Sequence, residues 1–165
     1  MARILVVGGG CRGRELAGWL TGHGHAVRIT SRSPEGRAEI EGVGAECWPG
    51  TPERLATLRG ALDGVAVACW LLGGASGAAG ALEELHTVRL EFFLTQMIDT
   101  TVRGFVYEGR GTTGAAAALG EGEQIARRVC ERNAIPLAVL DRTAAEGDLW
   151  QQQARGAIEE LLGGR

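Results

Sequence analysis

Short apolar runs alternate with amphipathic stretches along the whole chain. A continuous apolar run is typical of a strand buried on both faces, and apolar positions three and four residues apart are typical of a helix. The pattern predicts strands at Arg3–Val7, Ala26–Thr30, Gly44–Pro49, Val65–Leu72, Thr101–Tyr107 and Ile135–Leu140. Helical stretches separate them, so we expect an α/β fold: a doubly wound parallel sheet of about six strands in the order 3-2-1-4-5-6, with helices on both faces.

The amphipathic stretches that follow these strands predict helices of unequal length. They cover Gly13–Thr21, Pro34–Glu41, a stretch from Thr51 to about Asp63, Ala78–Asp99, Ala115–Asn133 and Ala144–Leu162. The third has a favourable start, because Thr51 suits the N-cap and Pro52 the first helical position. The fourth is the longest, and its expected apolar face consists of Leu82, Leu85, Val88, Phe92, Met97 and Ile98. His86 and Arg89 are interpreted as surface residues of that helix.

The turn after the first strand contains Gly8, Gly10 and Gly13, which form the pattern G-x-G-x-x-G. The first glycine permits a tight turn, the second lets a pyrophosphate approach the backbone, and the third lets the helix pack closely on the sheet. The helix N-terminus adds free N–H groups and a positive dipole end. We therefore predict a dinucleotide site formed by Gly8, Gly10, Cys11, Arg12 and Gly13. The alternative is a glycine-rich turn that binds nothing, in a chain with 27 glycines.

The end of the second strand indicates which dinucleotide is bound. A site that prefers NAD usually has Asp or Glu about 20 residues past the glycines, where it holds the ribose hydroxyls. No acidic residue occurs from Ala26 to Pro34; Ser31, Arg32 and Ser33 stand there instead. Arg32 can pair with a 2′-phosphate, the serines can donate to it, and Arg12 can reach it from the other side. These positions favour NADP over NAD; the alternative for Arg32 is a solvated loop arginine.

The fourth predicted strand ends in Leu72, Gly73 and Gly74, followed by Ala75, Ser76 and Gly77. Small residues at this carboxyl end leave room beside the first glycine loop, as a cofactor crevice requires. We therefore add Leu72, Gly73 and Gly74 to the expected cofactor contacts. The alternative is a flexible glycine turn.

Composition excludes several classes of function. The length of 165 residues suits a single domain over 1–165, and the net charge of −3 argues against a nucleic-acid or membrane partner. No apolar run is long enough to span a membrane and no signal peptide precedes the first strand, which predicts a cytoplasmic protein. The cysteines (Cys11, Cys47, Cys69 and Cys130) form no C-x-x-C pair, and His23 and His25 lack a third ligand nearby, so no metal is expected.

With Gly8-x-Gly10-x-x-Gly13, Thr30-Ser31-Arg32 and the strand Arg103–Tyr107, the chain resembles the short-chain dehydrogenase/reductase superfamily. The stretch Gly122–Arg128, followed by Ile135–Leu140, is similar to its atypical or extended members, which are NmrA-like or epimerase-like. The resemblance implies a Rossmann fold, an NADP site and a homodimer formed through the helices that begin at Ala78 and Gly122.

The chain departs from that superfamily at the catalytic motif Tyr-x-x-x-Lys. All 17 basic residues are arginines, and four positions after Tyr107, the only tyrosine, stands Gly111. The extended members also carry a substrate-binding portion after the sixth strand, whereas this chain ends one helix later. The resemblance therefore implies the cofactor more firmly than the reaction.

Two functions of different classes remain open. The first is an NADP-dependent oxidoreductase acting on an unknown small molecule, with Tyr107, Glu108 and Ser76 as the polar candidates near the cofactor. For Tyr107 the competing interpretation is a half-buried strand residue, and for Glu108 an exposed loop residue. The second function is a non-catalytic NADP(H) sensor. A nucleotide-binding methyltransferase is a weaker third hypothesis, because it also requires an acid after the second strand.

Overall fold

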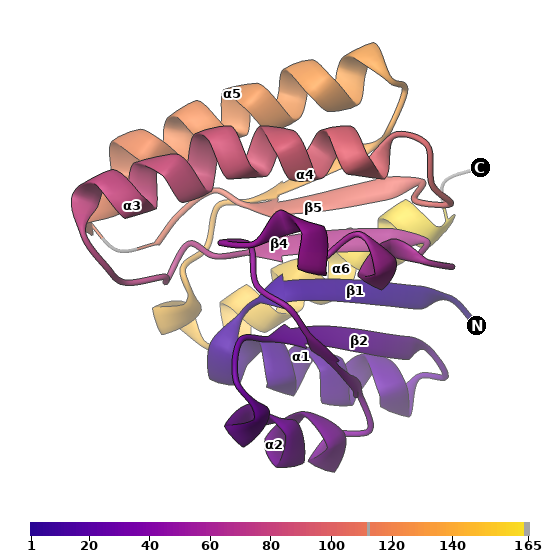
Figure 1. Cartoon of the computed structure of the whole chain (residues 1–165). Helices are drawn as coiled ribbons and strands as arrows, with labels where there is room; N and C mark the ends of the chain where they lie inside the picture. Colours follow the sequence, from indigo (N-terminus) through magenta and orange to yellow (C-terminus); the bar gives the residue numbers. More distant parts are fainter. Residues whose placement is uncertain (112, 164–165) are drawn as a thin grey trace.

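Six parallel strands form one sheet in the order β3-β2-β1-β4-β5-β6. Figure 1 shows β2, β1, β4 and β5 side by side in this order. The computed structural model describes residues 1–111 and 113–163. The strands are β1 (Arg3–Gly8), β2 (Ala26–Ser31), β3 (Glu46–Pro49), β4 (Val67–Leu71), β5 (Gly104–Glu108) and β6 (Leu137–Leu140). The predicted fold class and strand order are confirmed.

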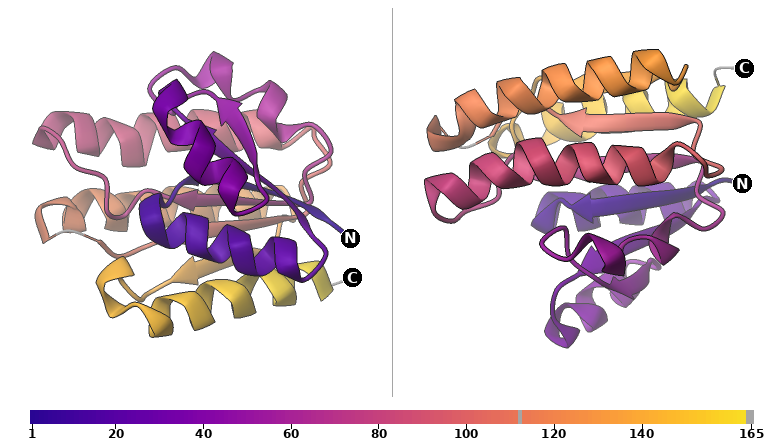
Figure 2. Two further views of the ribbon diagram at one scale, coloured as in Figure 1. Left: turned by 90° about the horizontal axis from the view of Figure 1, so that it is seen from below. Right: turned by 45° about the horizontal axis from the view of Figure 1, so that its top comes forward.

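Helices cover both faces of the sheet, as the two views of Figure 2 show. The α-helices are α1 (Gly10–Gly22), α2 (Arg37–Gly42), α3 (Ala79–Glu84), α4 (Leu90–Met97), α5 (Ala116–Arg132) and α6 (Asp148–Gly163). Short 3-10 turns occur at η1 (Pro34–Gly36), η2 (Leu55–Thr57), η3 (Gly60–Leu62), η5 (Thr113–Ala115) and η6 (Ala144–Glu146). Helices α1, α2 and α6 lie on one face, and α4 and α5 lie on the other.

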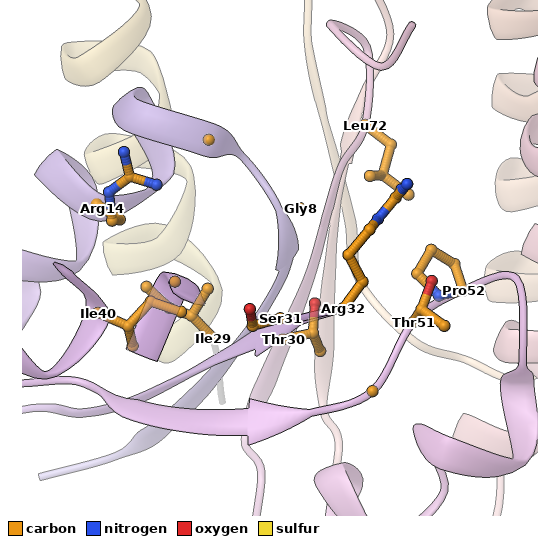
Figure 3. Close-up of a pocket in the computed structure, with 13 residues that line it drawn as sticks. Gly8, Arg14, Ile29, Thr30, Ser31, Arg32, Ile40, Thr51, Pro52 and Leu72 are labelled. Atoms are coloured by element: carbon orange, nitrogen blue, oxygen red, sulfur yellow. The ribbon is translucent and has the colours of Figure 1, made fainter. Parts of the chain in front are cut away.

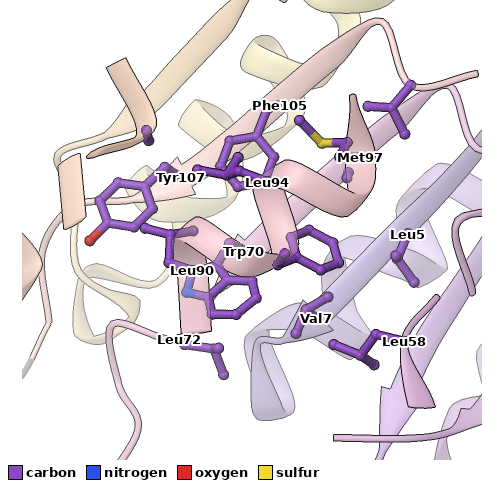
Figure 4. Close-up of a cluster of buried hydrophobic side chains, with 14 of the residues drawn as sticks. Leu5, Val7, Leu58, Trp70, Leu72, Leu90, Leu94, Met97, Phe105 and Tyr107 are labelled. Carbon is purple, nitrogen blue, oxygen red and sulfur yellow. The ribbon is translucent and has the colours of Figure 1, made fainter. Parts of the chain in front are cut away.

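Alternate residues of the central strands supply two hydrophobic cores. Leu5 and Trp70 point into the core under α4 and α5, whereas Ile4 and Cys69 point into the core under α1 and α6. Figure 4 shows the first core, with the Trp70 and Phe105 rings beside α4. Burial on both faces explains why these strands are continuous apolar runs rather than alternating ones.

The helix expected from Thr51 to Asp63 is wrong, since the segment forms only the turns η2 and η3. The Thr57 hydroxyl accepts a hydrogen bond from the Thr51 amide at 2.9 Å and donates to the Arg54 carbonyl at 2.6 Å. These side-chain bonds fold the segment back on itself and compete with a helical ladder. Leu58 and Leu62 are buried nevertheless, so the segment still covers the sheet.

The long helix expected from Ala78 contains a π-turn, η4 (Leu85–Arg89), between α3 and α4. A π-turn inserts one extra residue and rotates the face that follows. Val88, within the turn, is 65% exposed and Phe92, after it, is 54% exposed, although both were expected in the apolar face. His86, expected at the surface, is fully buried, and burial lowers its pKa.

None of the helices within residues 1–111 and 113–163 combines the length and apolar character that crossing a membrane requires.

Candidate functional site

The glycine loop between β1 and α1 has a backbone that only glycine adopts easily. Gly8, Gly9 and Gly10 have φ angles of 83°, 90° and 52°. A Cβ on Gly8 would overlap the Leu72 side chain and lie 2.7 Å from the Leu71 carbonyl. The Gly9 amide donates to that same carbonyl at 2.7 Å. The first glycine of the motif is therefore required by the close approach of the loop to the end of β4.

The other two motif glycines have different surroundings. A Cβ on Gly13 would lie 3.2 Å from the Gly8 carbonyl, which makes Gly13 a close-packing position. A Cβ on Gly10 would meet no atom within 4 Å. Open space therefore lies above Gly10, at the N-terminus of α1, where the first N–H groups lack helical partners and the described first turn holds no acidic residue. An anionic diphosphate fits these residues.

A cavity of about 210 Å³ opens beside this loop, over the ends of β1, β2 and β3 (Figure 3). Five expected residues line it: Gly8, Gly10, Ser31, Arg32 and Leu72. The remaining wall comes from residues that were not predicted as cofactor contacts, namely Arg14, Ile29, Thr30, Gly36, Ile40, Gly50, Thr51 and Pro52. The structure thus brings the glycine loop, the end of β2 and the end of β4 to one cavity.

Arg14 and Arg32 lie on opposite sides of this cavity in Figure 3. Arg32 pairs with Glu53 at 3.4 Å, and Arg14 pairs with Glu39 at 3.2 Å. Sequence reasoning missed Arg14, although it directly follows Gly13 and belongs to the first turns of α1. The two guanidinium groups give the cavity a positive lining that exposed carboxylates partly neutralise.

The expectation that Arg12 reaches the same phosphate needs correction. The Arg12 side chain points to the C-terminal segment, where Nε donates to the Ala144 carbonyl at 3.2 Å and Nη1 pairs with Glu15 at 3.0 Å. Gln151 in turn donates to the Arg12 carbonyl at 2.9 Å. Arg12 therefore fastens the glycine loop to η6 and α6, and Arg14 takes the place expected for it at the cavity.

The small polar residues expected at the cavity divide into two groups. Ser31 lines it, but its hydroxyl donates to the Ser33 carbonyl at 2.7 Å. Ser33 and Cys11 lie outside the lining; Cys11 is exposed, and its sulfur accepts a hydrogen bond from Arg14. Of these three residues, Ser31 alone therefore lines the cavity.

Gly73 was expected to leave room for a cofactor, and the structure assigns it another role. A Cβ there would overlap the Arg110 carbonyl and lie 2.7 Å from Glu108 Oε1. Gly73 is therefore small because the loops after β4 and β5 touch one another. Gly74, in contrast, is exposed with nothing within 4 Å of its Cβ position, and Ser76 is exposed as well.

Tyr107 and Glu108, the candidate acid–base residues, are both buried. The Tyr107 hydroxyl donates to the Leu119 carbonyl at 2.8 Å, and burial raises its pKa. Glu108 is 4% exposed; Oε1 accepts from the Gly73 amide at 2.6 Å and Oε2 from Trp150 Nε1 at 2.7 Å. The interpretations of a half-buried tyrosine and an exposed glutamate are therefore wrong, and neither side chain lines the cavity.

Burial also governs three of the four cysteines. Cys47, Cys69 and Cys130 are buried, as expected for small hydrophobic residues, and burial raises the pKa of Cys69 to about 12. Across the described ranges 1–111 and 113–163, no three His, Cys, Asp or Glu side chains come together in a way that could hold a metal ion.

No known family model matches the sequence, and no curated protein matches it. Solved structures do match its fold. A putative short-chain dehydrogenase/reductase from Corynebacterium glutamicum is 18% identical with a TM-score of 0.71, covering 94% of this chain and 91% of its own. Triphenylmethane reductase from Citrobacter sp., in complex with NADP(H), is 17% identical with a TM-score of 0.63, covering 83% of this chain and 48% of its own.

UDP-glucuronic acid 4-epimerase from Bacillus cereus, in complex with NAD, is 13% identical with a TM-score of 0.67. The match covers 86% of this chain and 56% of the epimerase, so this chain spans about half the length of the epimerase and the reductase. Identities this low establish architecture alone. The chain therefore has the α/β Rossmann fold, with strand order 3-2-1-4-5-6, that these dehydrogenase/reductase and epimerase structures share.

Proposed function

We propose that this chain binds NADP(H), with its diphosphate at the N-terminus of α1 and its 2′-phosphate between Arg14 and Arg32. The observation that carries the proposal is the open space over Gly10, continuous with a cavity that two arginines flank. A ligand that bears a diphosphate for the first place and a single phosphate for the second fits both features. The absence of an acid from Ala26 to Pro34 also favours a phosphate over free ribose hydroxyls.

The ion pairs in the cavity wall support a phosphate in particular. Arg14 and Arg32 hold Glu39 and Glu53, and all four side chains are accessible to solvent. An exposed arginine–carboxylate pair contributes little to stability, whereas arginine binds phosphate through paired charge-assisted hydrogen bonds. A phosphate can therefore replace the two carboxylates at low cost. The volume of about 210 Å³ suits the adenosine half of the dinucleotide, with the other half extending beyond it.

Titration with NADPH and NADH tests this assignment. We expect the wild-type protein to bind NADPH more tightly, and Arg32→Ala and Arg14→Ala each to weaken NADPH binding about tenfold, because each removes a charged partner of the phosphate. NADH binding should change less than about twofold in either variant. The measurement is fluorescence titration of the purified protein with each cofactor.

Arg37→Ala is the matched control, since Arg37 pairs with Glu41 on α2 and does not line the cavity. It should bind both cofactors as the wild type does. Equal wild-type affinity for NADPH and NADH would contradict the 2′-phosphate assignment, as would an equal loss of both cofactors in Arg32→Ala.

Two activities are compatible with this site: an oxidoreductase acting on a small molecule, and a non-catalytic sensor of NADP(H). The bound nicotinamide supplies hydride, so the protein needs to orient the substrate and to move a proton. The buried, hydrogen-bonded states of Tyr107 and Glu108, together with the lack of lysine, favour the sensor. NADPH oxidation in the presence of a panel of carbonyl compounds separates the two: turnover identifies an enzyme, and binding without turnover a sensor.

We further propose that α4 and α5 form a homodimer contact. Val88 and Phe92 are exposed on this side, which also carries acidic Glu83 on α3 and basic Arg132 on α5. A two-fold contact brings Val88 and Phe92 of one protomer against the same residues of its partner and allows Glu83 to approach the partner's arginine at the C-terminal end of α5. Light scattering should give twice the chain mass for the wild type and the monomer mass for Phe92→Glu.

Leu149→Glu is the control for the dimer, because Leu149 is a similarly exposed large hydrophobic residue on α6. It should leave the dimer intact. A monomeric wild type, or a dimer that survives Phe92→Glu, would contradict the assignment.

A further inference from the structure

The carboxylate of Glu108 connects three segments that are distant in the sequence. It stands at the end of β5, accepts a hydrogen bond from the Gly73 amide in the loop after β4, and accepts another from Trp150 in α6. Both bonds are short, at 2.6 Å and 2.7 Å, as expected for donors to a carboxylate. A buried carboxylate usually pairs with a cation. Glu108 is buried but takes part in no ion pair among the described residues.

The two donors explain why a carboxylate occupies this position. A carboxylate offers an acceptor on each oxygen, whereas an amide offers one acceptor and turns an NH₂ group toward the second donor. Replacing Glu108 by glutamine sets an NH₂ group against the N–H of either Gly73 or Trp150. That N–H then has no acceptor, and a buried donor without an acceptor is costly. Burial raises the pKa of Glu108, and the hydrogen bonds from Trp150, Gly73 and Gly74 oppose that rise.

The loop that Glu108 holds adjoins the cavity. Leu72, the residue before Gly73, lines the cavity, and Leu71 accepts the hydrogen bond of the Gly9 amide. On its other side Gly73 packs against Arg110 and Gly111, so that the loops after β4 and β5 lock together. The start of this loop is therefore fixed between the glycine loop and the end of β5.

A dinucleotide in a Rossmann fold crosses the point where the strand order reverses, which here lies between β1 and β4. Its adenosine half then lies over β2, in the cavity, and the half beyond the diphosphate lies on the β4 side. We infer that Glu108 is a positioning residue for that second half, acting through the Gly73 amide on the loop at Gly73–Gly77. This inference rests on the proposed NADP(H) site.

The test compares two ligands on one variant. NADPH contains both halves, whereas adenosine 2′,5′-bisphosphate contains the adenine, the ribose and the 2′-phosphate but no nicotinamide half. In Glu108→Gln we expect the Kd for NADPH to rise about tenfold and the Kd for the bisphosphate to change less than about twofold. Both titrations are done well below the melting temperature of the variant, so that the protein is folded.

Tyr107→Phe is the matched control. It removes a neighbouring buried hydrogen bond that ties β5 to the Leu119 carbonyl in α5, away from the loop after β4. It should lower the melting temperature and leave the ratio of the two dissociation constants unchanged. If Glu108→Gln is not recovered as folded protein, Trp150→Phe replaces it, because loss of the bond to Oε2 releases one of the two anchors of the carboxylate that holds the Gly73 amide.

The outcomes separate this inference from the proposed function. If the wild type binds both ligands but Glu108→Gln weakens both equally, or neither, then Glu108 has only a structural role and the positioning inference is overturned. If the wild type binds neither ligand, the NADP(H) site itself is overturned. A selective loss of NADPH supports both.

Discussion

Gly10→Ala is expected to weaken NADPH binding about a hundredfold while the protein stays folded. The Cβ of Gly10 would enter open space, so the folded chain without ligand tolerates it sterically. The φ angle of 52° lies in the left-handed region, where alanine costs about 1 kcal/mol more than glycine. The same Cβ would stand where the diphosphate approaches the N-terminus of α1. Fluorescence titration with NADPH and thermal denaturation together measure both effects.

Gly24→Ala controls for the backbone conformation. Gly24 also has a positive φ, at 86°, and also has nothing within 4 Å of its Cβ position, but it lies after α1 at the other end of the helix. It should lose about the same stability, about 1 kcal/mol, and bind NADPH as the wild type does. If Gly10→Ala bound NADPH with wild-type affinity, the open space above Gly10 would not be the diphosphate site.

Gly122→Ala is expected to destabilise the protein by about 3 kcal/mol, which corresponds to a melting temperature about 10 °C lower. A Cβ on Gly122 would overlap the Tyr107 hydroxyl and lie 2.5 Å from the His86 carbonyl. Accommodation requires α5 to move away from both, which breaks the hydrogen bond from Tyr107 to Leu119. Urea denaturation followed by circular dichroism measures the free energy of unfolding.

Gly120→Ala lies on the same helix and should have the opposite effect. Its Cβ would meet no atom within 4 Å, and Gly120 is exposed. Alanine in a helix is more favourable than glycine by about 1 kcal/mol, so this variant should gain up to that amount. A Gly122→Ala variant as stable as the wild type would show that α5 does not approach the π-turn this closely.

The predicted strands were correct because their signal is local. Residues 65–72 and 104–107 are apolar without interruption, and a strand buried on both faces requires that composition whatever its neighbours are. The glycine turn after β1 was also predicted correctly, because the positive φ angles of Gly8 and Gly10 belong to the turn that the motif itself forms, whereas the contact of Gly8 with Leu71 and Leu72 is tertiary. The helix expected after Thr51 failed because its start signal was outweighed by the hydrogen bonds of Thr57.

The arginines at the cavity show which features local sequence signals do not predict. The end of β2 placed Arg32 at the cavity correctly, because strand ends meet at one edge of a parallel sheet. Which residue of α1 faces that edge depends on the helical rotation set by packing against the sheet. Helical rotation turns Arg14 toward the cavity and Arg12 toward η6, and no spacing rule distinguishes the two in advance.

The sequence by itself determined the α/β architecture, the strand order and the location of the glycine loop, since periodicity and glycine spacing depend on neighbours along the chain. Only the tertiary structure decided that His86 is buried and that Val88 and Phe92 are exposed, because the π-turn that contains the first two and precedes the third changes which side chains face the core. It likewise decided that Glu108 joins Gly73 to Trp150. Such contacts join residues far apart in sequence, and their geometry exists only once the strands have been assembled in the sheet.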